Sequence, residues 1–103
     1  MKISLGYITC PTKAEAKNIV LALLEEKLIA CANIIPSAES YFVWDDEIQM
    51  ANESVIIFKT KQKNEDKIIR FVRHVHSYEV PCIVFMPLDN GNPEFLKWVE
   101  ESC

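Results

Sequence analysis

The chain has 103 residues, of which 50% are hydrophobic and 25% charged, so we expect one globular domain over residues 1–103 with a single core. The formal net charge is −4, and the scattered Lys and Arg side chains form no basic stripe, which argues against a nucleic-acid partner. No apolar run is long enough to cross a membrane, and the opening residues lack the apolar core of a signal peptide. We therefore expect a cytoplasmic protein with reduced thiols and no membrane partner.

The first part of the chain predicts a strand followed by a helix. The strand covers Ile3–Thr9 and ends at Cys10-Pro11. Thr12 and Glu15 have the spacing of a capping box, in which the Thr hydroxyl accepts from a first-turn amide and Glu15 reaches back to the cap. A helix to about Lys27 follows. Its apolar stripe consists of Ala16, Ile19, Val20, Leu23 and Leu24.

The middle of the chain predicts a long β-hairpin. Leu28–Ile35 is almost continuously apolar, as in a strand that is buried on both faces. After a break at Pro36, Ser40–Trp44 is rich in aromatic and β-branched residues, and Asp45-Asp46 is a turn signal. The returning strand consists of Glu47–Met50, a candidate bulge at Ala51-Asn52, and Ser54–Thr60.

The last part predicts a helix, a strand and a terminal helix. The first helix begins near Asn64, the strand covers Val80–Met86, and Pro93 suits the first position of the terminal helix. The order is therefore β-α-β-β-α-β plus a C-terminal helix. We predict an α+β, ferredoxin-like fold, with one antiparallel sheet, two helices on one face and a long hairpin between the second and third strands.

The predicted hairpin is too long for two helices to cover. Each of its aromatic residues buries about 150–250 Å² when another chain covers it. Three of them would therefore supply most of the about 800 Å² that each partner buries in a standard interface. We therefore expect an obligate homo-oligomer. The alternative is a hairpin that bends back onto its own sheet. The apolar residues of the overhang are Tyr41, Phe42, Val43, Trp44, Ile48 and Met50.

A polar segment precedes the last predicted strand. His76, Tyr78 and Glu79 lie within four positions, and Pro81 restricts the residue before it to extended geometry. Side chains that bind protons or metals therefore gather where a rigid sheet begins, which is a common location for a functional site.

Several segments together resemble the CutA divalent-cation tolerance proteins, over nearly the whole chain and in the family's order. The segments are Thr9-Cys10-Pro11, Glu26–Pro36, Ser40-Tyr41-x-x-Trp44, Lys59-Thr60, His76-x-Tyr78-Glu79-Val80-Pro81 and Gly91–Leu96-x-Trp98. The resemblance implies a ferredoxin-like subunit in a tight homotrimer, similar in form to the PII nitrogen-regulatory proteins. It also implies a role linked to tolerance of copper and other divalent metals.

The chain departs from some bacterial members of that family at positions implicated in copper binding. Ile8 takes the place of a cysteine in the first strand, and Val75 takes the place of the first of two histidines. Only His76 matches, and Ser77 replaces a proline. These departures argue against assigning the copper ligands of those members to this chain position by position.

The candidate metal ligands are Cys10 and His76, with His74 and Glu79 as secondary candidates, because thiolates and imidazoles suit copper. In the predicted fold the first strand lies beside the last, so Cys10 can approach the loop that holds His76, within or across subunits. Cys10 also precedes a helix N-terminus, where a thiolate would be stabilised. The alternative for His76 is a hydrogen-bonded residue that shapes the turn.

The remaining cysteines and residues carry weaker predictions. Cys31 and Cys82 are interpreted as small buried hydrophobes. An enzyme could use Cys10 as nucleophile, His76 as base and Glu79 to orient the imidazole, but nothing local supports the third partner or an oxyanion site. No phosphate loop, Gly-rich turn or nucleotide motif is present, so we expect neither an enzyme nor an organic cofactor. The alternative function is a PII-like signalling or scaffold trimer that binds a small molecule or protein in clefts between subunits. The residues expected in such a cleft are Tyr41, Trp44, Lys59, Tyr78 and Glu79, although we favour interface packing as the role of Tyr41 and Trp44.

Overall fold

The structure is a computed structural model that describes residues 2–103. In chain order its elements are β1 (Ile3–Cys10), α1 (Lys13–Glu25), β2 (Cys31–Trp44), β3 (Glu47–Lys61), a 3₁₀ turn (Gln62–Asn64), α2 (Glu65–Val75), β4 (Ile83–Leu88) and α3 (Pro93–Ser102). Within these residues four strands form one sheet in the order β2-β3-β1-β4, and every neighbouring pair is antiparallel. The predicted ferredoxin-like arrangement is confirmed.

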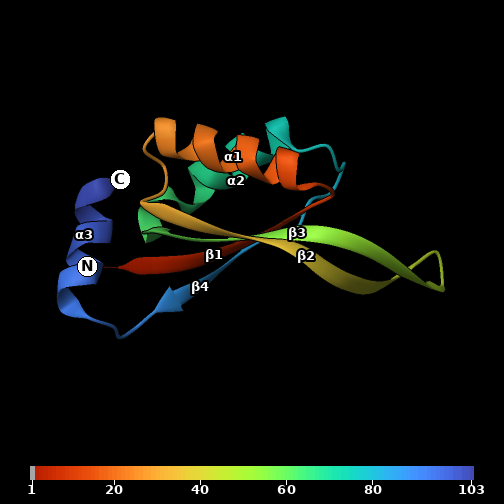
Figure 1. The fold of residues 1–103 in the computed structure, drawn as a ribbon. Helices are drawn as coiled ribbons and strands as arrows, with labels where there is room; N and C mark the ends of the chain where they lie inside the picture. Colours follow the sequence, from red (N-terminus) through yellow and green to blue (C-terminus); the bar gives the residue numbers. More distant parts are fainter. Residues whose placement is uncertain (1) are drawn as a thin grey trace.

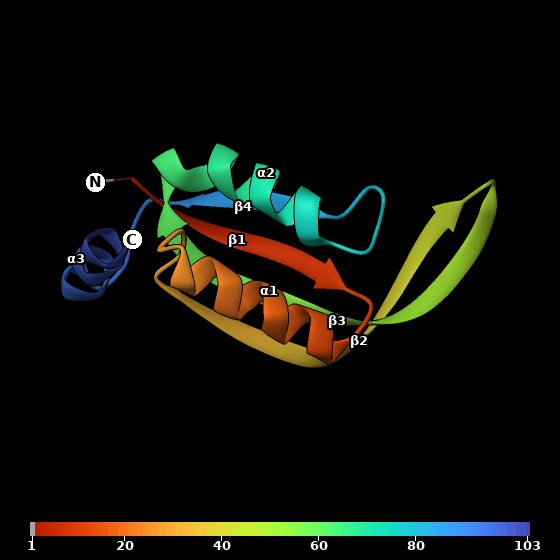
Figure 2. The same cartoon turned by 90° about the horizontal axis from the view of Figure 1, so that it is seen from above.

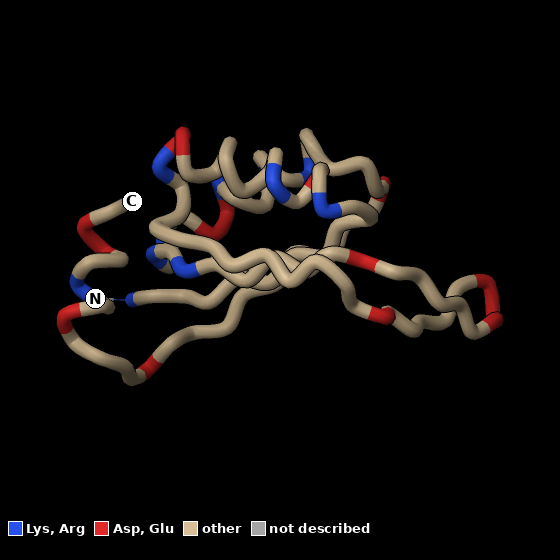
Figure 3. The backbone as a smooth tube through the Cα atoms, viewed as in Figure 1, with Lys and Arg blue, Asp and Glu red and all other residues tan. Residues whose placement is uncertain are grey.

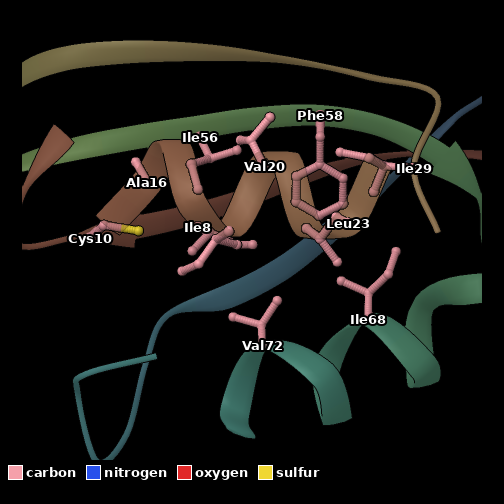
Figure 4. Packing of buried hydrophobic residues seen from close by; sticks show 11 residues of the cluster. Ile8, Cys10, Ala16, Val20, Leu23, Ile29, Ile56, Phe58, Ile68 and Val72 are labelled. Atoms are coloured by element: carbon pink, nitrogen blue, oxygen red, sulfur yellow. The ribbon is translucent and has the colours of Figure 1, made fainter. Parts of the chain in front are cut away.

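The core lies between the sheet and the two central helices. Both α1 and α2 cover the same face of the sheet, while α3 lies at the end where the chain begins (Figures 1 and 2). Strand residues Ile56 and Phe58 face Leu23 of α1 and Ile68 of α2, and all four are fully buried (Figure 4). This packing holds both helices to one layer and leaves the other face of the sheet without a helix among residues 2–103.

That second face of the sheet is apolar and exposed. Tyr7 on β1 pairs with Val84 on β4, and the two side chains are 37% and 53% exposed. Met86 on β4 and Ile35 on β2 are also exposed. Because neighbouring residues of a strand point to opposite faces, the burial of Ile8 under the helices directs Tyr7 to this open face.

A single glycine permits the closest contact inside the core. Gly6 of β1 pairs with Phe58 on one side and with Phe85 on the other, and the two rings meet edge to face with centroids 5.8 Å apart. A Cβ atom at Gly6 would lie only 2.0 Å from Cζ of Phe58. The ring therefore packs directly on the backbone of β1, and no side chain fits there.

The caps of the helices agree in part with the sequence. Thr12 Oγ1 accepts from the Glu15 amide at 3.1 Å, as predicted for α1. The Glu15 side chain, however, extends to the Ser77 amide rather than back to the cap. At α3, Asn92 Oδ1 accepts from the Glu94 amide and Pro93 is the first helical residue, as expected.

Three predictions about the strands are wrong. The second strand is covered by a helix on one face only, and Ile35 lies on the open face, so it is 45% exposed rather than buried. The irregularity of the hairpin lies at Pro36-Ser37, between Ile35 and Ala38, and not at Ala51-Asn52, which is regularly paired. The last strand begins at Ile83, because Pro81 has no amide to donate to a ladder. Cys82 before it is consequently exposed, not buried.

The β2–β3 hairpin extends beyond both helices instead of folding back on the sheet (Figures 1 and 2). Its turn places Asp45 and Asp46 at φ values of 51° and 62°, the left-handed geometry that tight hairpins need. The molecule is therefore elongated, with extents of 44 × 26 × 22 Å. The exposed apolar side chains of the arm are Tyr41, Phe42, Val43, Trp44, Ile48 and Met50.

Candidate metal cluster and adjoining cleft

Three side chains of metal-binding type meet at one end of the sheet. Cys10 ends β1, Glu15 lies in the first turn of α1, and His76 follows the end of α2. One ligand atom from each of the three lies within 4.8 Å of the other two. The structure therefore brings Cys10 and His76 together within one chain.

Glu15 is the member of this cluster that sequence analysis missed. Its position three residues after Thr12 is explained by helix capping alone, so nothing local indicates a second role. Its Oε2 accepts from the Ser77 amide at 3.0 Å and lies 3.4 Å from Nδ1 of His76. Glu15 thus connects α1 to the segment that follows α2.

His76 is buried, and both of its ring nitrogens have backbone partners. Nε2 lies 2.8 Å from the Thr9 carbonyl oxygen, and the Tyr78 amide donates to Nδ1 at 3.0 Å. Because a carbonyl only accepts and an amide N–H only donates, this arrangement requires the neutral tautomer with its proton on Nε2. His76 therefore fixes the 76–82 loop to the end of β1, which is the turn-shaping role that the sequence leaves open.

The charge of Glu15 is stabilised by its neighbours. Partial burial acts to raise the pKa of this carboxyl, but the hydrogen bonds from Ser77 outweigh it, and the pKa is lowered. Glu15 is consequently an anion at neutral pH. It gives the cluster one permanent negative charge.

Cys10 is not the reactive thiolate that its position before a helix suggests. Its side chain is fully buried, and burial together with the charges of Glu15 and Glu53 raises its pKa to about 12. The prediction of a stabilised thiolate is therefore wrong. Desolvation and two nearby carboxylates outweigh the favourable field of the α1 N-terminus.

The donor set of the cluster nevertheless fits a soft or borderline divalent ion. Sulfur, imidazole nitrogen and carboxylate oxygen together suit copper or zinc. In the resting arrangement Cys10 is protonated and Nδ1 of His76 is occupied by the Tyr78 amide. Metal binding therefore has to release the thiol proton and displace one hydrogen bond, which makes affinity strongly dependent on pH.

The two secondary candidates lie elsewhere. His74 is exposed in the last turn of α2, and Glu79 is exposed in the loop beyond His76. Neither belongs to the group of ligand atoms described above. Glu79 instead lines a neighbouring cleft.

This cleft has a volume of about 750 Å³ and lies between the hairpin arm, where its lining extends to Trp44 next to the turn, and the 77–82 loop. Four of the five residues that the sequence analysis assigns to a cleft between subunits line this cleft of the single chain, namely Tyr41, Trp44, Tyr78 and Glu79. The fifth, Lys59, is elsewhere on β3, where it pairs with Leu5 and donates to Asn33. The full lining consists of Thr9, Ser40, Tyr41, Phe42, Trp44, Glu53, Ser77, Tyr78, Glu79, Val80 and Cys82.

Glu53 is the acidic residue of the cleft lining that sequence analysis missed. It is a carboxylate on β3 with only 9% of its surface exposed, and its Oε2 accepts from the Tyr78 hydroxyl at 2.9 Å. Burial and the bond to Glu53 raise the pKa of Tyr78 to about 12. Partial desolvation of the Cys82 thiol and the charge of Glu53 also raise the pKa of Cys82. The polar end of the cleft is therefore negative.

Comparisons with known proteins agree with the observed fold. A family model described as CutA1 divalent ion tolerance protein matches residues 4–102. The CutA homolog of Xenopus laevis is 38% identical over 97 residues, which are 94% of this chain and 64% of the relative. The chain thus spans less than two thirds of that relative's length.

Solved structures show the same similarity along almost the whole chain. The periplasmic divalent cation tolerance protein CutA of Archaeoglobus fulgidus has a TM-score of 0.94 at 39% identity, with 97% of each chain covered. CutA1 of Oryza sativa has a TM-score of 0.96 at 32% identity, covering 99% of this chain and 94% of that one. The resemblance found in the sequence is confirmed, and the chain belongs to the CutA1 divalent ion tolerance protein family.

Proposed function

We propose that this protein contributes to divalent-cation tolerance as a homotrimer that binds a metal ion, preferentially copper, at Cys10, Glu15 and His76. The observation that carries the proposal is the approach of a thiol, a carboxylate and an imidazole to within 4.8 Å of one another. The names of the family and of its relatives, which refer to divalent ions, support it. In this proposal the protein binds its metal as cargo and catalyses no reaction.

The preference for copper follows from the ligand types. Affinity of nitrogen and sulfur ligands for divalent first-row metals peaks at Cu²⁺. Only a metal that binds sulfur strongly can displace the proton of a thiol as weakly acidic as Cys10. Nδ1 of His76 is the ring nitrogen that faces Glu15, so it is the imidazole atom proposed as ligand.

The trimer is proposed from the family resemblance and from two uncovered apolar surfaces. One is the face of the sheet opposite the helices, with Tyr7, Val84 and Met86. The other is the hairpin arm, where Trp44 is 62% exposed. Exposed apolar area of this extent is typical of surfaces that pair with another chain.

A copper titration of the reduced, metal-free protein tests the metal site. Zinc serves as competitor, and native mass spectrometry records the copper content of each species. We expect saturation at one copper per chain, with weaker binding at lower pH because the Cys10 proton must leave. Weak uptake that never saturates would contradict the proposed site.

Variants separate this cluster from surface binding. His76→Ala and Glu15→Gln should each weaken copper binding by about 10–100-fold, the usual cost of disturbing a metal ligand or its support. His74→Ala is the matched control, because His74 is exposed two residues away and outside the cluster. Equal loss in the His74 and His76 variants would show that copper binds unspecifically to this end of α2.

The oligomer is tested independently by native mass and dilution. We expect a mass of three chains for the parent protein. Trp44→Ala should weaken the assembly, because the proposed interface would bury this side chain. Truncating a buried aromatic residue costs about 3–5 kcal/mol. Leu21→Ala is the control, because Leu21 is 53% exposed on α1, away from both apolar surfaces. Equal dissociation of both variants would show that Trp44 does not lie in the interface.

We propose the cytoplasm as the location because all four cysteines are free, as thiols are in a reducing compartment. None of the helices in residues 2–103 is long and apolar enough to span a membrane. Fractionation of cells with selective release of the periplasm tests the location. Recovery of the protein in the periplasmic fraction would contradict it.

A further inference from the structure

We propose that a metal ion enters and leaves the buried cluster through the groove between α1 and α2, and that Glu15 is the first ligand it meets. This inference rests on the proposed function and assigns an entry route to the same site. The two helices lie side by side over one face of the sheet (Figure 2). The groove between them has a volume of about 380 Å³ and is lined by Glu15, Asn18, Ile19, Ala22 and Val75.

The first argument is the exposure of the three candidate ligands. Cys10 is fully buried, and the side chain of His76 has no exposed surface. The side chain of Glu15 is 20% exposed. A metal site needs an entry path as well as ligands. An ion outside the protein can touch Glu15 but neither of the other two ligands, so entry begins at this carboxylate.

The second argument is the position of Glu15 between the groove and the cluster. Its Oε2 lies 3.4 Å from Nδ1 of His76, and the same residue is part of the groove lining. None of the three candidate ligands lines the cleft beside the 77–82 loop. An ion that Glu15 takes up from the groove is therefore already next to the imidazole.

The third argument is the chemistry of the groove. Glu15, Asn18 and Ala22 are three and four positions apart, so they share one face of α1. Glu15 is the only charged residue of the lining, which includes no Lys, Arg or His. The small side chain of Ala22 leaves space along the same face. A cation in the groove therefore meets one carboxylate and no positive charge from the lining.

The groove is separate from both surfaces that are proposed to form the trimer. None of its lining residues belongs to the uncovered face of the sheet or to the arm. The helices cover the face of the sheet opposite that open one, and the arm extends beyond them (Figures 1 and 2). The cleft beside the 77–82 loop is walled by aromatic residues of the arm, which the proposed interface would cover. The groove is therefore the route that the proposed assembly leaves open.

The kinetics of copper exchange test the route on the assembled protein. Asn18→Phe narrows the groove about one helical turn from Glu15 and removes no ligand. An obstruction of the route slows entry and exit by the same factor, so we expect both rate constants to fall about tenfold. The dissociation constant is their ratio and should stay within about twofold of the parent value. Leu21→Phe is the matched control, because Leu21 is exposed on α1 outside the lining.

A second pair of variants narrows the groove from its other wall. Val75→Phe should slow exchange in the same way, since Val75 is 43% exposed and lines the groove from α2. His74→Phe is its control, because His74 is exposed on α2 outside the lining. Circular dichroism and native mass verify that each variant folds and assembles.

The signal has to report binding at Cys10 itself. Figure 3 shows acidic positions along the arm and no basic one, so the arm attracts divalent cations of its own. Stopped-flow absorption of the copper–thiolate band under argon excludes such binding, because the arm has no cysteine. Release is followed on the same band after the loaded protein is mixed with excess EDTA.

The outcomes distinguish the route from the site. Saturable copper binding, with Asn18→Phe and Val75→Phe exchanging copper as fast as their controls, would overturn the route and leave the proposed site intact. A weaker dissociation constant with an unchanged entry rate would also overturn the route, because the groove residues would then act on the bound metal. No saturable binding by the parent protein would refute the site and the route together.

Discussion

Replacing Gly6 by Ala should destabilise the protein through a single contact. Gly6 lies in a central strand, paired with Phe58 on β3 and Phe85 on β4. The added Cβ would lie 2.0, 2.3 and 2.4 Å from three atoms of the Phe58 ring. Ordinary carbon contacts are about 3.5–4.0 Å, so the ring has to move by more than 1 Å.

The size of the effect follows from where the ring can go. Phe58 is completely buried, and its ring already packs edge to face on Phe85. Overpacking a core by one methyl group typically costs about 1–3 kcal/mol. Since the blocked atoms belong to a rigid aromatic ring between two strands, we expect about 3 kcal/mol. The free energy of unfolding of a typical domain is about 5–15 kcal/mol, so this loss would be a large part of it.

Denaturant unfolding at fixed chain concentration measures this cost, because the stability of an assembly depends on concentration. Gly91→Ala is the control. Its Cβ would meet Leu96 at 3.4–3.5 Å, which is ordinary contact, so a change within about 0.5 kcal/mol is expected. Combining Gly6→Ala with Phe58→Leu should cost less than the sum of the single changes. If Gly6→Ala and Gly91→Ala unfold alike, the packing argument is refuted.

Three further outcomes follow from pKa values and exposure. Iodoacetamide should modify exposed Cys82 well before buried Cys10 in the native protein, as measured by peptide mass mapping; equal rates would contradict the burial of Cys10. The pKa of Glu15 is lowered from 4.5, so the stability that its carboxylate contributes is lost as the pH falls below that value. Glu15→Gln should therefore lose less stability than the parent on acidification, and equal loss in both proteins would contradict this role of Glu15. The pKa of Tyr78 is raised from 10.0 to about 12, so stability should decrease between these pH values in the parent and less so in Tyr78→Phe, as followed by circular dichroism.

The fold could be predicted because local signals agreed with one another. Residues that are close together in the sequence determine each of three features: the cap at Thr12, the turn at Asp45-Asp46 and the start of α3 at Pro93. Errors arose where an apolar run was interpreted as burial within the subunit. Ile35, which was predicted to be buried, lies on the face of the sheet that no helix covers and is 45% exposed.

The candidate site could be predicted only in part, because it depends on contacts between distant segments. Cys10 and His76 have the side-chain chemistry of ligands, so the residue types alone indicate them. Glu15 and Glu53 look like ordinary surface carboxylates in the sequence, and only the fold brings them within reach of His76 and Tyr78. The state of Cys10 depends on its burial and on two distant charges, and no pattern in the sequence encodes either.

The metal cluster and the cleft share a short connection through the loop. His76 accepts from the Tyr78 amide, and the Tyr78 hydroxyl donates to Glu53. A metal ion on Nδ1 of His76 would have to displace the Tyr78 amide, so metal binding and the order of this loop are linked. The metal cluster and the polar end of the cleft therefore meet at one residue, Tyr78.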